Sequence, residues 1–177
     1  MTTTSRILRF CRFWLPVLLW LGVIALESFR LSSVVTGGWL RHLLGWLHLS
    51  LSGPQFETFH HILRKTGHFV GYGLLCLLLF RAWFHTLSSR KNQLQRFRLR
   101  CALAAIAGTL LTAVLDEWHQ SFDSLRTSTP KDVVLDVSGG IAALLLAYVV
   151  FKMWGRDRDE GRDGSFITEP EREVHSL

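Results

Sequence analysis

Hydrophobic residues in this chain gather in long blocks rather than at the spacing of a soluble amphipathic helix. A helix needs roughly 17–25 apolar residues to cross a bilayer. Four blocks approach that length, at residues 13–29, 67–84, 101–118 and 133–154. The pattern predicts an all-α fold, a membrane-embedded four-helix bundle within residues 13–154. It also predicts a basic N-terminal segment at 1–12 and a disordered, charged tail at 155–177.

The connection between the first two blocks carries a shorter helical pattern. Its apolar residues recur at helical spacing, at Trp39, Leu40, Leu43, Leu44 and Leu47. The pattern predicts an additional amphipathic helix that lies in the membrane interface, with its tryptophans at headgroup depth. We expect this helix to cover the mouth of the bundle, either as a surface helix or as a lid.

The basic residues mark one side of the membrane. The formal net charge is +6, and Lys and Arg sit in short runs beside the apolar blocks, with three arginines in residues 1–12 and five basic residues in 85–100. This bias predicts a multi-pass plasma-membrane protein with both termini in the cytoplasm. No stretch has the features of a nucleic-acid recognition module, so the sequence predicts no nucleic-acid partner.

The cysteines and the first block limit other functions. The three cysteines include no Cys-x-x-Cys pair, so the sequence predicts neither a disulfide framework nor a cysteine metal site. No standard zinc spacing such as His-Glu-x-x-His occurs either, and we expect no metal and no cofactor. The segment from Ile24 to Glu27 lacks the small-x-small cleavage pattern of a signal peptide, so we expect an uncleaved first helix.

Charged residues gather at the outer ends of the predicted spans. Asp116 and Glu117 directly follow a fifteen-residue stretch without charge, and Asp132 and Asp136 open the fourth block. The helical spacing of Lys65, His68 and Tyr72 places them on one face. Charges at such positions are costly and need partners, so these residues predict a charged cap at one bundle mouth. Nearby small residues are expected to allow close helix packing, namely Gly67, Gly71 and Gly73.

Three segments of this cap resemble the VanZ-like family of membrane proteins. They are residues 64–69 with Tyr72, residues 116–120, and Arg126 followed by Asp132, Asp136 and Gly139. The similarity covers roughly residues 15–152. It departs from the family at Ser124-Leu125, where Pro-Gly is frequent, and at Asp136, where Asn is frequent. The resemblance implies a role connected with susceptibility to the glycopeptide antibiotic teicoplanin.

Three hypotheses for the cap remain open. The charges can tie the helix ends together, or they can bind a lipid-linked precursor, a lipid headgroup or a lipoglycopeptide without catalysis. Alternatively, the protein is a membrane enzyme on a lipid-linked substrate, with Asp116 and Glu117 as acid and base and His68 as a further candidate. The residues predicted to bind a ligand are Lys65, His68, Tyr72, Asp116, Glu117, Gln120, Arg126, Asp132 and Asp136.

Overall fold

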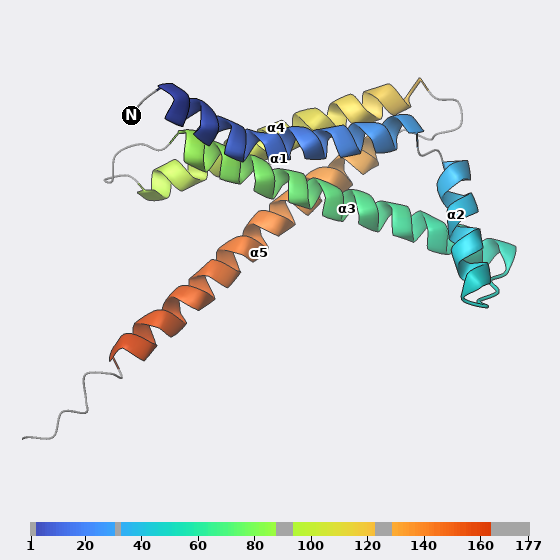
Figure 1. Ribbon diagram of the computed structural model, residues 1–177. Coiled ribbons are helices and arrows are strands. Elements are labelled where there is room, and N and C mark those ends of the chain that lie inside the picture. The colour runs from blue at the N-terminus through green and yellow to red at the C-terminus, as the bar shows by residue number, and fades with distance from the viewer. Residues whose placement is uncertain (1–2, 31–32, 88–93, 123–128, 164–177) are drawn as a thin grey trace, which may run out of the picture. The chain divides into compact units, whose positions relative to one another are not determined.

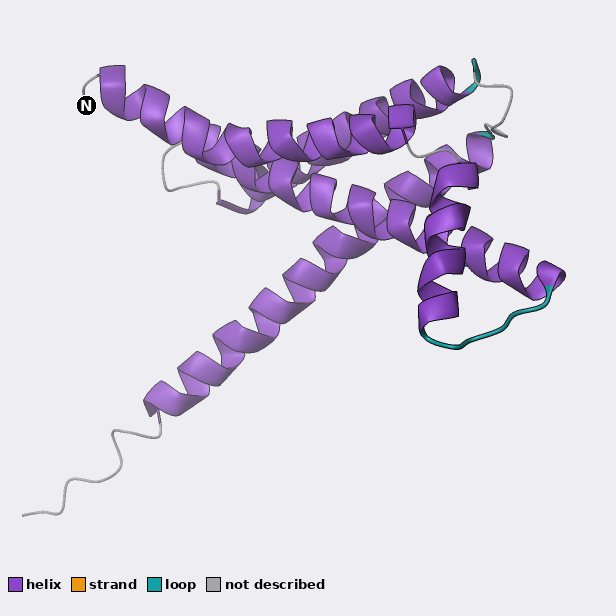
Figure 2. Ribbon diagram, turned by 45° about the vertical axis from the view of Figure 1, so that its right-hand side comes forward, coloured by secondary structure: helices purple, strands orange, loops and turns teal. Residues whose placement is uncertain are grey.

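The computed structural model describes residues 3–30, 33–87, 94–122 and 129–163. These residues form five helices and no strand, which confirms the predicted all-α fold (Figures 1 and 2). The helices are α1 (Thr3–Arg30), α2 (Ser33–Trp46), α3 (Gly53–Thr86), α4 (Leu94–Gln120) and α5 (Pro130–Asp163).

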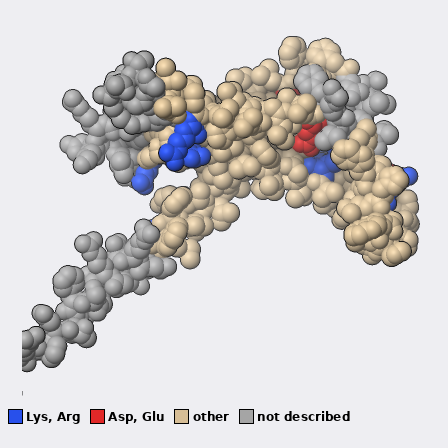
Figure 3. Space-filling view, in the orientation of Figure 1, with Lys and Arg blue, Asp and Glu red and all other residues tan. Residues whose placement is uncertain are grey.

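Four of these helices are long and apolar enough to cross a membrane. The qualifying segments lie at residues 10–28, 53–86, 98–120 and 130–154. Many large apolar side chains on them are exposed, including Leu18, Leu111 and Leu146. Apolar surface of this extent is the surface that lipid covers in a membrane protein. Figure 3 shows a wide uncharged surface between charged patches near the two ends of the helices.

The chain forms two compact units, and the division falls inside α5. The first unit covers residues 1–144 and the second covers residues 145–177. The described residues of the second unit form the later part of α5, which continues to Asp163, nine residues beyond the predicted end of the fourth span. The helix therefore extends into the segment predicted to be a disordered tail. Residues 164–177 lie outside the described residues.

The predicted additional helix is present as α2, and it packs on the first turns of α3. Thr36 Oγ1 lies 2.9 Å from His60 Nε2, and the Arg41 guanidinium pairs with Glu57 at 3.6 Å. Trp39 and Trp46 on α2 are exposed. The contacts join α2 to the bundle, while the exposed tryptophans suit an interfacial position.

Helix α3 begins fourteen residues before the predicted second span. The Ser52 backbone N–H donates to Gln55 Oε1 at 3.0 Å, and Pro54 occupies the first turn, so the helix starts at Gly53. At 1.5 Å per residue, its length is about 51 Å, against a hydrocarbon core of about 30 Å. The first turns of α3 therefore have length to spare for packing against α2.

Helices α1, α3 and α4 share the core of the first unit. The side of α4 that faces α3 carries small, fully buried residues one turn apart, Ala105, Thr109 and Ala113. Small side chains allow two helix backbones to approach closely where lipid supplies no hydrophobic driving force. They pack there against Leu75 and Cys76 of α3, which are also fully buried.

Glycines set the contact between α3 and α5. A Cβ on Gly139 would collide with the Phe69 carbonyl oxygen, and a Cβ on Gly73 would lie 3.2 Å from the Gly139 carbonyl oxygen. A Cβ on Gly140 would press on Cys76 at 3.1 Å. Backbone atoms cannot move aside as a flexible side chain can. The two helices therefore reach this distance only because position 139 has no side chain.

We expect Gly139→Ala to destabilise the bundle by about 1–3 kcal/mol, because the added methyl forces α3 and α5 apart. Denaturant unfolding of the purified protein in micelles measures this change. Gly22→Ala in α1 is the matched control, since a Cβ there would meet no atom of the described residues within 4 Å. Equal stability of the two variants would contradict the close approach of α3 and α5.

Candidate functional site

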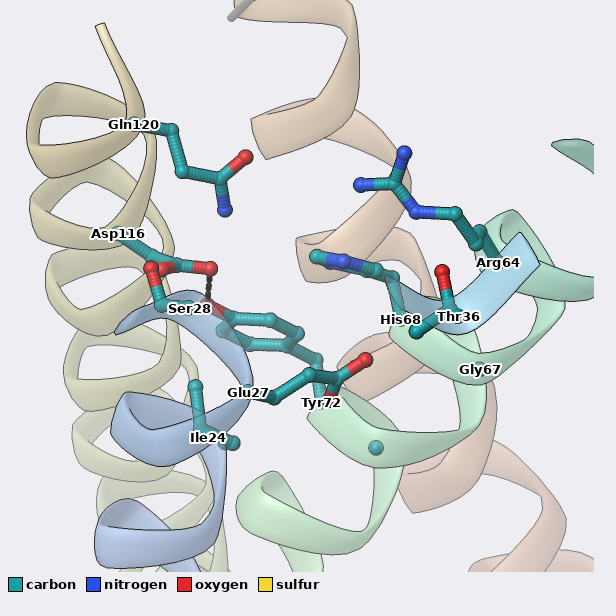
Figure 4. Close-up of a pocket in the computed structure, with 11 residues that line it drawn as sticks. Ile24, Glu27, Ser28, Thr36, Arg64, Gly67, His68, Tyr72, Asp116 and Gln120 are labelled. Atoms are coloured by element: carbon teal, nitrogen blue, oxygen red, sulfur yellow. Dashed lines mark hydrogen bonds between the residues drawn. The ribbon is translucent and has the colours of Figure 1, made fainter. Parts of the chain in front are cut away.

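A cavity opens at the end of the first unit where α1 and α4 finish. The cavity and the open solvent at its mouth together occupy about 440 Å³. Four helices contribute to its wall, and their side chains point toward one another in Figure 4. The residues that line the cavity are Ile24, Glu27, Ser28, Thr36, Arg64, Gly67, His68, Gly71, Tyr72, Asp116 and Gln120.

One face of α3 supplies the largest share of the wall. Arg64, His68 and Tyr72 follow one another at four-residue spacing, which aligns them along a single helix face. The His68 and Tyr72 rings stack at 6.2 Å between centroids. The Trp20 indole N–H of α1 donates to the Gly71 carbonyl at 2.9 Å and anchors α1 against this face.

The glycines on this face do not all serve packing. Gly73 contacts α5, as predicted for a small packing residue. Gly67 and Gly71 line the cavity instead, and a Cβ at either position would meet nothing within 4 Å among the described residues. The prediction that all three allow close helix packing is therefore wrong for Gly67 and Gly71. The missing side chains at these two positions leave cavity space.

Asp116 joins α4 to α3 at the floor of the cavity. The Tyr72 hydroxyl donates to Asp116 Oδ2 at 3.0 Å, and both side chains are buried. A hydrogen bond to a charged acceptor is stronger than a neutral one, and burial makes its loss costly. This contact holds the Asp116 carboxylate at the cavity.

His68 and Asp136 form a buried pair between α3 and α5. Their closest atoms, Nδ1 and Oδ1, are 3.5 Å apart, and the Asp136 side chain is 1% exposed. Among the described residues, neither Asp136 oxygen accepts a hydrogen bond. A buried carboxylate depends on a nearby cation, so His68 is the partner that makes Asp136 tolerable. With Nδ1 turned to Asp136, Nε2 is the ring nitrogen left for the cavity.

The Gln120 side chain places a hydrogen-bond donor in the cavity wall, and no described residue accepts from it. The side chain is 5% exposed, and within the described part of the chain its Nε2 has no acceptor. Figure 4 shows the amide directed into the space between Asp116 and His68. Buried donors in native proteins are almost always satisfied, so an orphaned one facing a cavity indicates a ligand or ordered water.

A second set of polar residues ties helix ends together outside the cavity wall. Lys65 pairs with Asp132 at 3.7 Å, and Asp132 Oδ2 accepts from the Thr129 hydroxyl at 2.9 Å. Glu117 Oε2 accepts the Thr129 backbone N–H at 3.1 Å, next to the start of α5. Thr129 and Glu117 thus satisfy polar groups at the N-terminus of α5.

Comparison with known proteins identifies the group to which this fold and site belong. The model of the VanZ/LLP1 family matches residues 13–152. The chain belongs to the VanZ/LLP1 family. Searches of curated proteins and of solved structures found no significant match. The matched range includes every residue of the cavity wall, the second and third membrane-length segments, and all but the outer two or three residues of the first and fourth. The protein is therefore a multi-pass membrane protein of the VanZ-like type.

The structure divides the ligand-binding residues predicted from the sequence of this VanZ/LLP1 protein. Those in the cavity wall are His68, Tyr72, Asp116 and Gln120. Those in contacts between helices are Lys65, Glu117, Asp132 and Asp136. Arg126 lies outside the described residues.

Sequence reasoning left four polar residues of the wall off that set, Glu27, Ser28, Thr36 and Arg64. The sequence did contain a sign that Arg64 belongs to the wall, since Arg64 precedes His68 by one helical turn and so shares its helix face. Glu27 and Ser28 had only their place near the end of an apolar block.

The catalytic candidates of this VanZ/LLP1 protein face different surroundings. Asp116 and His68 line the cavity, whereas Glu117 turns to Thr129. His119 Nδ1 lies 3.4 Å from the Ser28 hydroxyl. In the described ranges no three His, Cys, Asp or Glu side chains gather as a metal site would require. Adjacency of Asp116 and Glu117 in the sequence therefore does not make them a facing acid–base pair.

We expect His68→Ala to destabilise the protein by about 3 kcal/mol, because it leaves Asp136 buried without its cation. Lys65→Met is expected to cost less than about 1 kcal/mol, since that ion pair is partly exposed. Denaturant unfolding in micelles compares the two variants.

A double-mutant cycle provides the control for His68→Ala. Adding Asp136→Asn removes the stranded charge, so the double variant should recover part of the lost stability. Additive losses from the two substitutions would show that His68 and Asp136 are not energetically coupled.

Proposed function

We propose that this VanZ/LLP1-family protein binds the polar headgroup of a cell-envelope lipid in the cavity, without catalysis, and that this binding affects susceptibility to teicoplanin. The observation that carries the proposal is the buried Gln120 amide, whose Nε2 faces the cavity without an acceptor in the described part of the chain. A ligand oxygen at this point satisfies the donor.

The donors around the cavity favour a phosphate group. The Arg64 guanidinium, the His68 ring and the Gln120 amide lie in the same wall (Figure 4). A guanidinium can donate two parallel hydrogen bonds to a phosphate, which adds both strength and orientation. Lys65 was the α3 cation expected to hold such a group, but it pairs with Asp132 and is not part of the cavity wall. Arg64 takes this role in the proposal.

The apolar surroundings of the cavity suit a lipid headgroup. Two exposed apolar residues are chain neighbours of residues in the cavity wall. Leu26 precedes Glu27, and Val70 precedes Gly71. Acyl chains can therefore lie on the apolar outer surface while the headgroup enters the cavity.

Two of the three hypotheses for the charged cap then apply to different residues. The pairs Lys65–Asp132 and Glu117–Thr129 support the stability of the helix ends. Arg64 and Gln120 support ligand binding. The catalytic hypothesis has less support, because Glu117 does not face the cavity that Asp116 lines.

The proposal includes an orientation in the membrane. Both termini lie in the cytoplasm of a plasma-membrane protein, as the excess of Lys and Arg before the first span and between the second and third favours. The cavity then opens to the outer leaflet, where envelope lipids and glycopeptides meet.

We expect Gly67→Leu to fill the cavity and weaken binding of fluorescent phospholipids to the purified protein by roughly tenfold or more, a change of about 1.4 kcal/mol. Gly67→Ala is the matched control. It adds a methyl that nothing described opposes, and alanine favours a helix over glycine by roughly 0.5–1 kcal/mol, so folding should be kept. Both variants are measured in micelles beside wild type.

The same pair separates binding from folding in cells. Gly67→Leu, at wild-type abundance, should remove any change in teicoplanin susceptibility that expression of the wild-type protein causes, and Gly67→Ala should keep it. If wild type and Gly67→Leu bind every tested lipid alike, the cavity is not a lipid-headgroup site and the proposal fails.

Cysteine labelling tests the orientation. In a Cys11→Ser background, a membrane-impermeant maleimide should label Trp39→Cys in intact cells and Leu87→Cys only after permeabilisation. Both positions are exposed, and the remaining Cys76 and Cys101 are buried. The opposite pattern would show that the cavity faces the cytoplasm.

A further inference from the structure

The cavity wall carries acidic groups as well as the proposed phosphate donors. Glu27 of α1 and Asp116 of α4 both line it. Asp136 lies directly behind His68, and all three carboxylates interact electrostatically with that ring. Among the described residues that line the wall, Glu27 and Asp116 carry a formal negative charge, Arg64 carries a formal positive charge, and His68 has a titratable ring.

We propose that the headgroup is zwitterionic, with a phosphate diester and a primary ammonium group, as in phosphoethanolamine. This inference rests on the proposed function and names the class of headgroup. Arg64, His68 and Gln120 receive the phosphate. Glu27 and Asp116 receive the ammonium group.

The cation of the wall and one of its carboxylates come from different helices. Arg64 and His68 come from α3 and Glu27 comes from the end of α1, while Gln120 and Asp116 lie one turn apart on α4. In Figure 4 the Glu27 carboxylate and the Arg64 guanidinium appear on opposite sides of the His68 ring. The described contacts of Asp116 engage Oδ2 through Tyr72, which leaves Oδ1 for a ligand donor. A headgroup that bridges the cavity thus meets opposite charge at each end.

Charge balance disfavours a purely anionic headgroup. A phosphate alone would add negative charge beside Glu27 and Asp116 in a partly buried site, where unpaired charge is costly. A zwitterion leaves the net charge of the cavity unchanged. The two carboxylates therefore weaken the binding of anionic lipids and strengthen the binding of cationic groups.

The wall also favours a primary ammonium over a trimethylammonium group. A primary ammonium donates three hydrogen bonds, which suit carboxylate oxygens. A choline group donates none and is usually held in a cage of aromatic faces. The aromatic side chains in the wall are Tyr72 and the His68 ring, and they stack on each other along α3. Phosphoethanolamine should therefore bind more tightly than phosphocholine.

A competition experiment on the full-length protein in micelles tests this preference. Fluorescent phosphatidylethanolamine is the probe, and short-chain phosphatidylethanolamine, phosphatidylcholine and phosphatidylglycerol are the competitors. We expect wild type to prefer phosphatidylethanolamine by about tenfold over each of the others, which corresponds to one well-made charged contact. Glu27→Gln, which keeps the size of the side chain, should lose this preference and still bind phosphatidylglycerol.

The outcomes distinguish this inference from the proposed function. Equal affinity of wild type for the three lipids, with binding still lost in Gly67→Leu, would overturn the ammonium site and keep the headgroup cavity. Failure of all three lipids and of free glycerophosphoethanolamine to bind would overturn both. A preference in wild type that Glu27→Gln leaves intact would remove Glu27 from the ammonium site. The wild-type comparison needs no variant, so it decides the matter even if Glu27→Gln does not fold.

Soluble headgroups identify the source of the ligand. Glycerophosphoethanolamine should displace the probe at lower concentration than glycerophosphocholine, and equal displacement would overturn the ammonium site. Binding of free glycerophosphoethanolamine without binding of the lipid would keep that site and assign it to a soluble ligand.

Discussion

The contact of Gly139 with the Phe69 carbonyl is the constraint on which the site depends. It lets the α3 and α5 backbones meet without a side chain between them, and so sets their register. With that register, Asp136, one turn before Gly139, stands opposite His68, next to Phe69. Lys65 and Asp132 pair one turn further along. A wider separation would strand a buried carboxylate, so packing and electrostatics support each other here.

The polar residues at this end of the bundle serve two purposes. The sequence shows them only as one cluster of charged residues and does not separate the two. Some satisfy each other across helix ends, as Glu117 does with the Thr129 backbone N–H. Others are held by a helix contact but still face a cavity, as Asp116 is held by Tyr72. Within the described part of the chain, the Gln120 amide departs from the rule that buried donors are paired. Such a departure is expected at a functional site, because a donor that is already satisfied has less to offer a ligand.

Glycine shows why residue type alone did not separate these purposes. Gly73 and Gly139 bring helices together, whereas Gly67, on the same helix as Gly73, leaves open space. In the sequence these three glycines cannot be told apart, because each is a small residue in an apolar segment. Only the direction in which each missing Cβ points distinguishes a packing glycine from one that shapes a cavity.

The sequence by itself determined the all-α fold, the four membrane-length helices and the helix between the first two, because the length and spacing of apolar runs are local properties. It also placed His68 with Tyr72, and Asp116 with Gln120, on shared helix faces, since helical spacing decides this. Tertiary structure decided which charges pair and which face the cavity. Asp116 and Glu117 are neighbours in the chain but turn to α3 and to the start of α5. Glu27 and Arg64 line the same cavity but belong to different helices. No local sequence pattern predicts this arrangement, because it depends on how the helices cross.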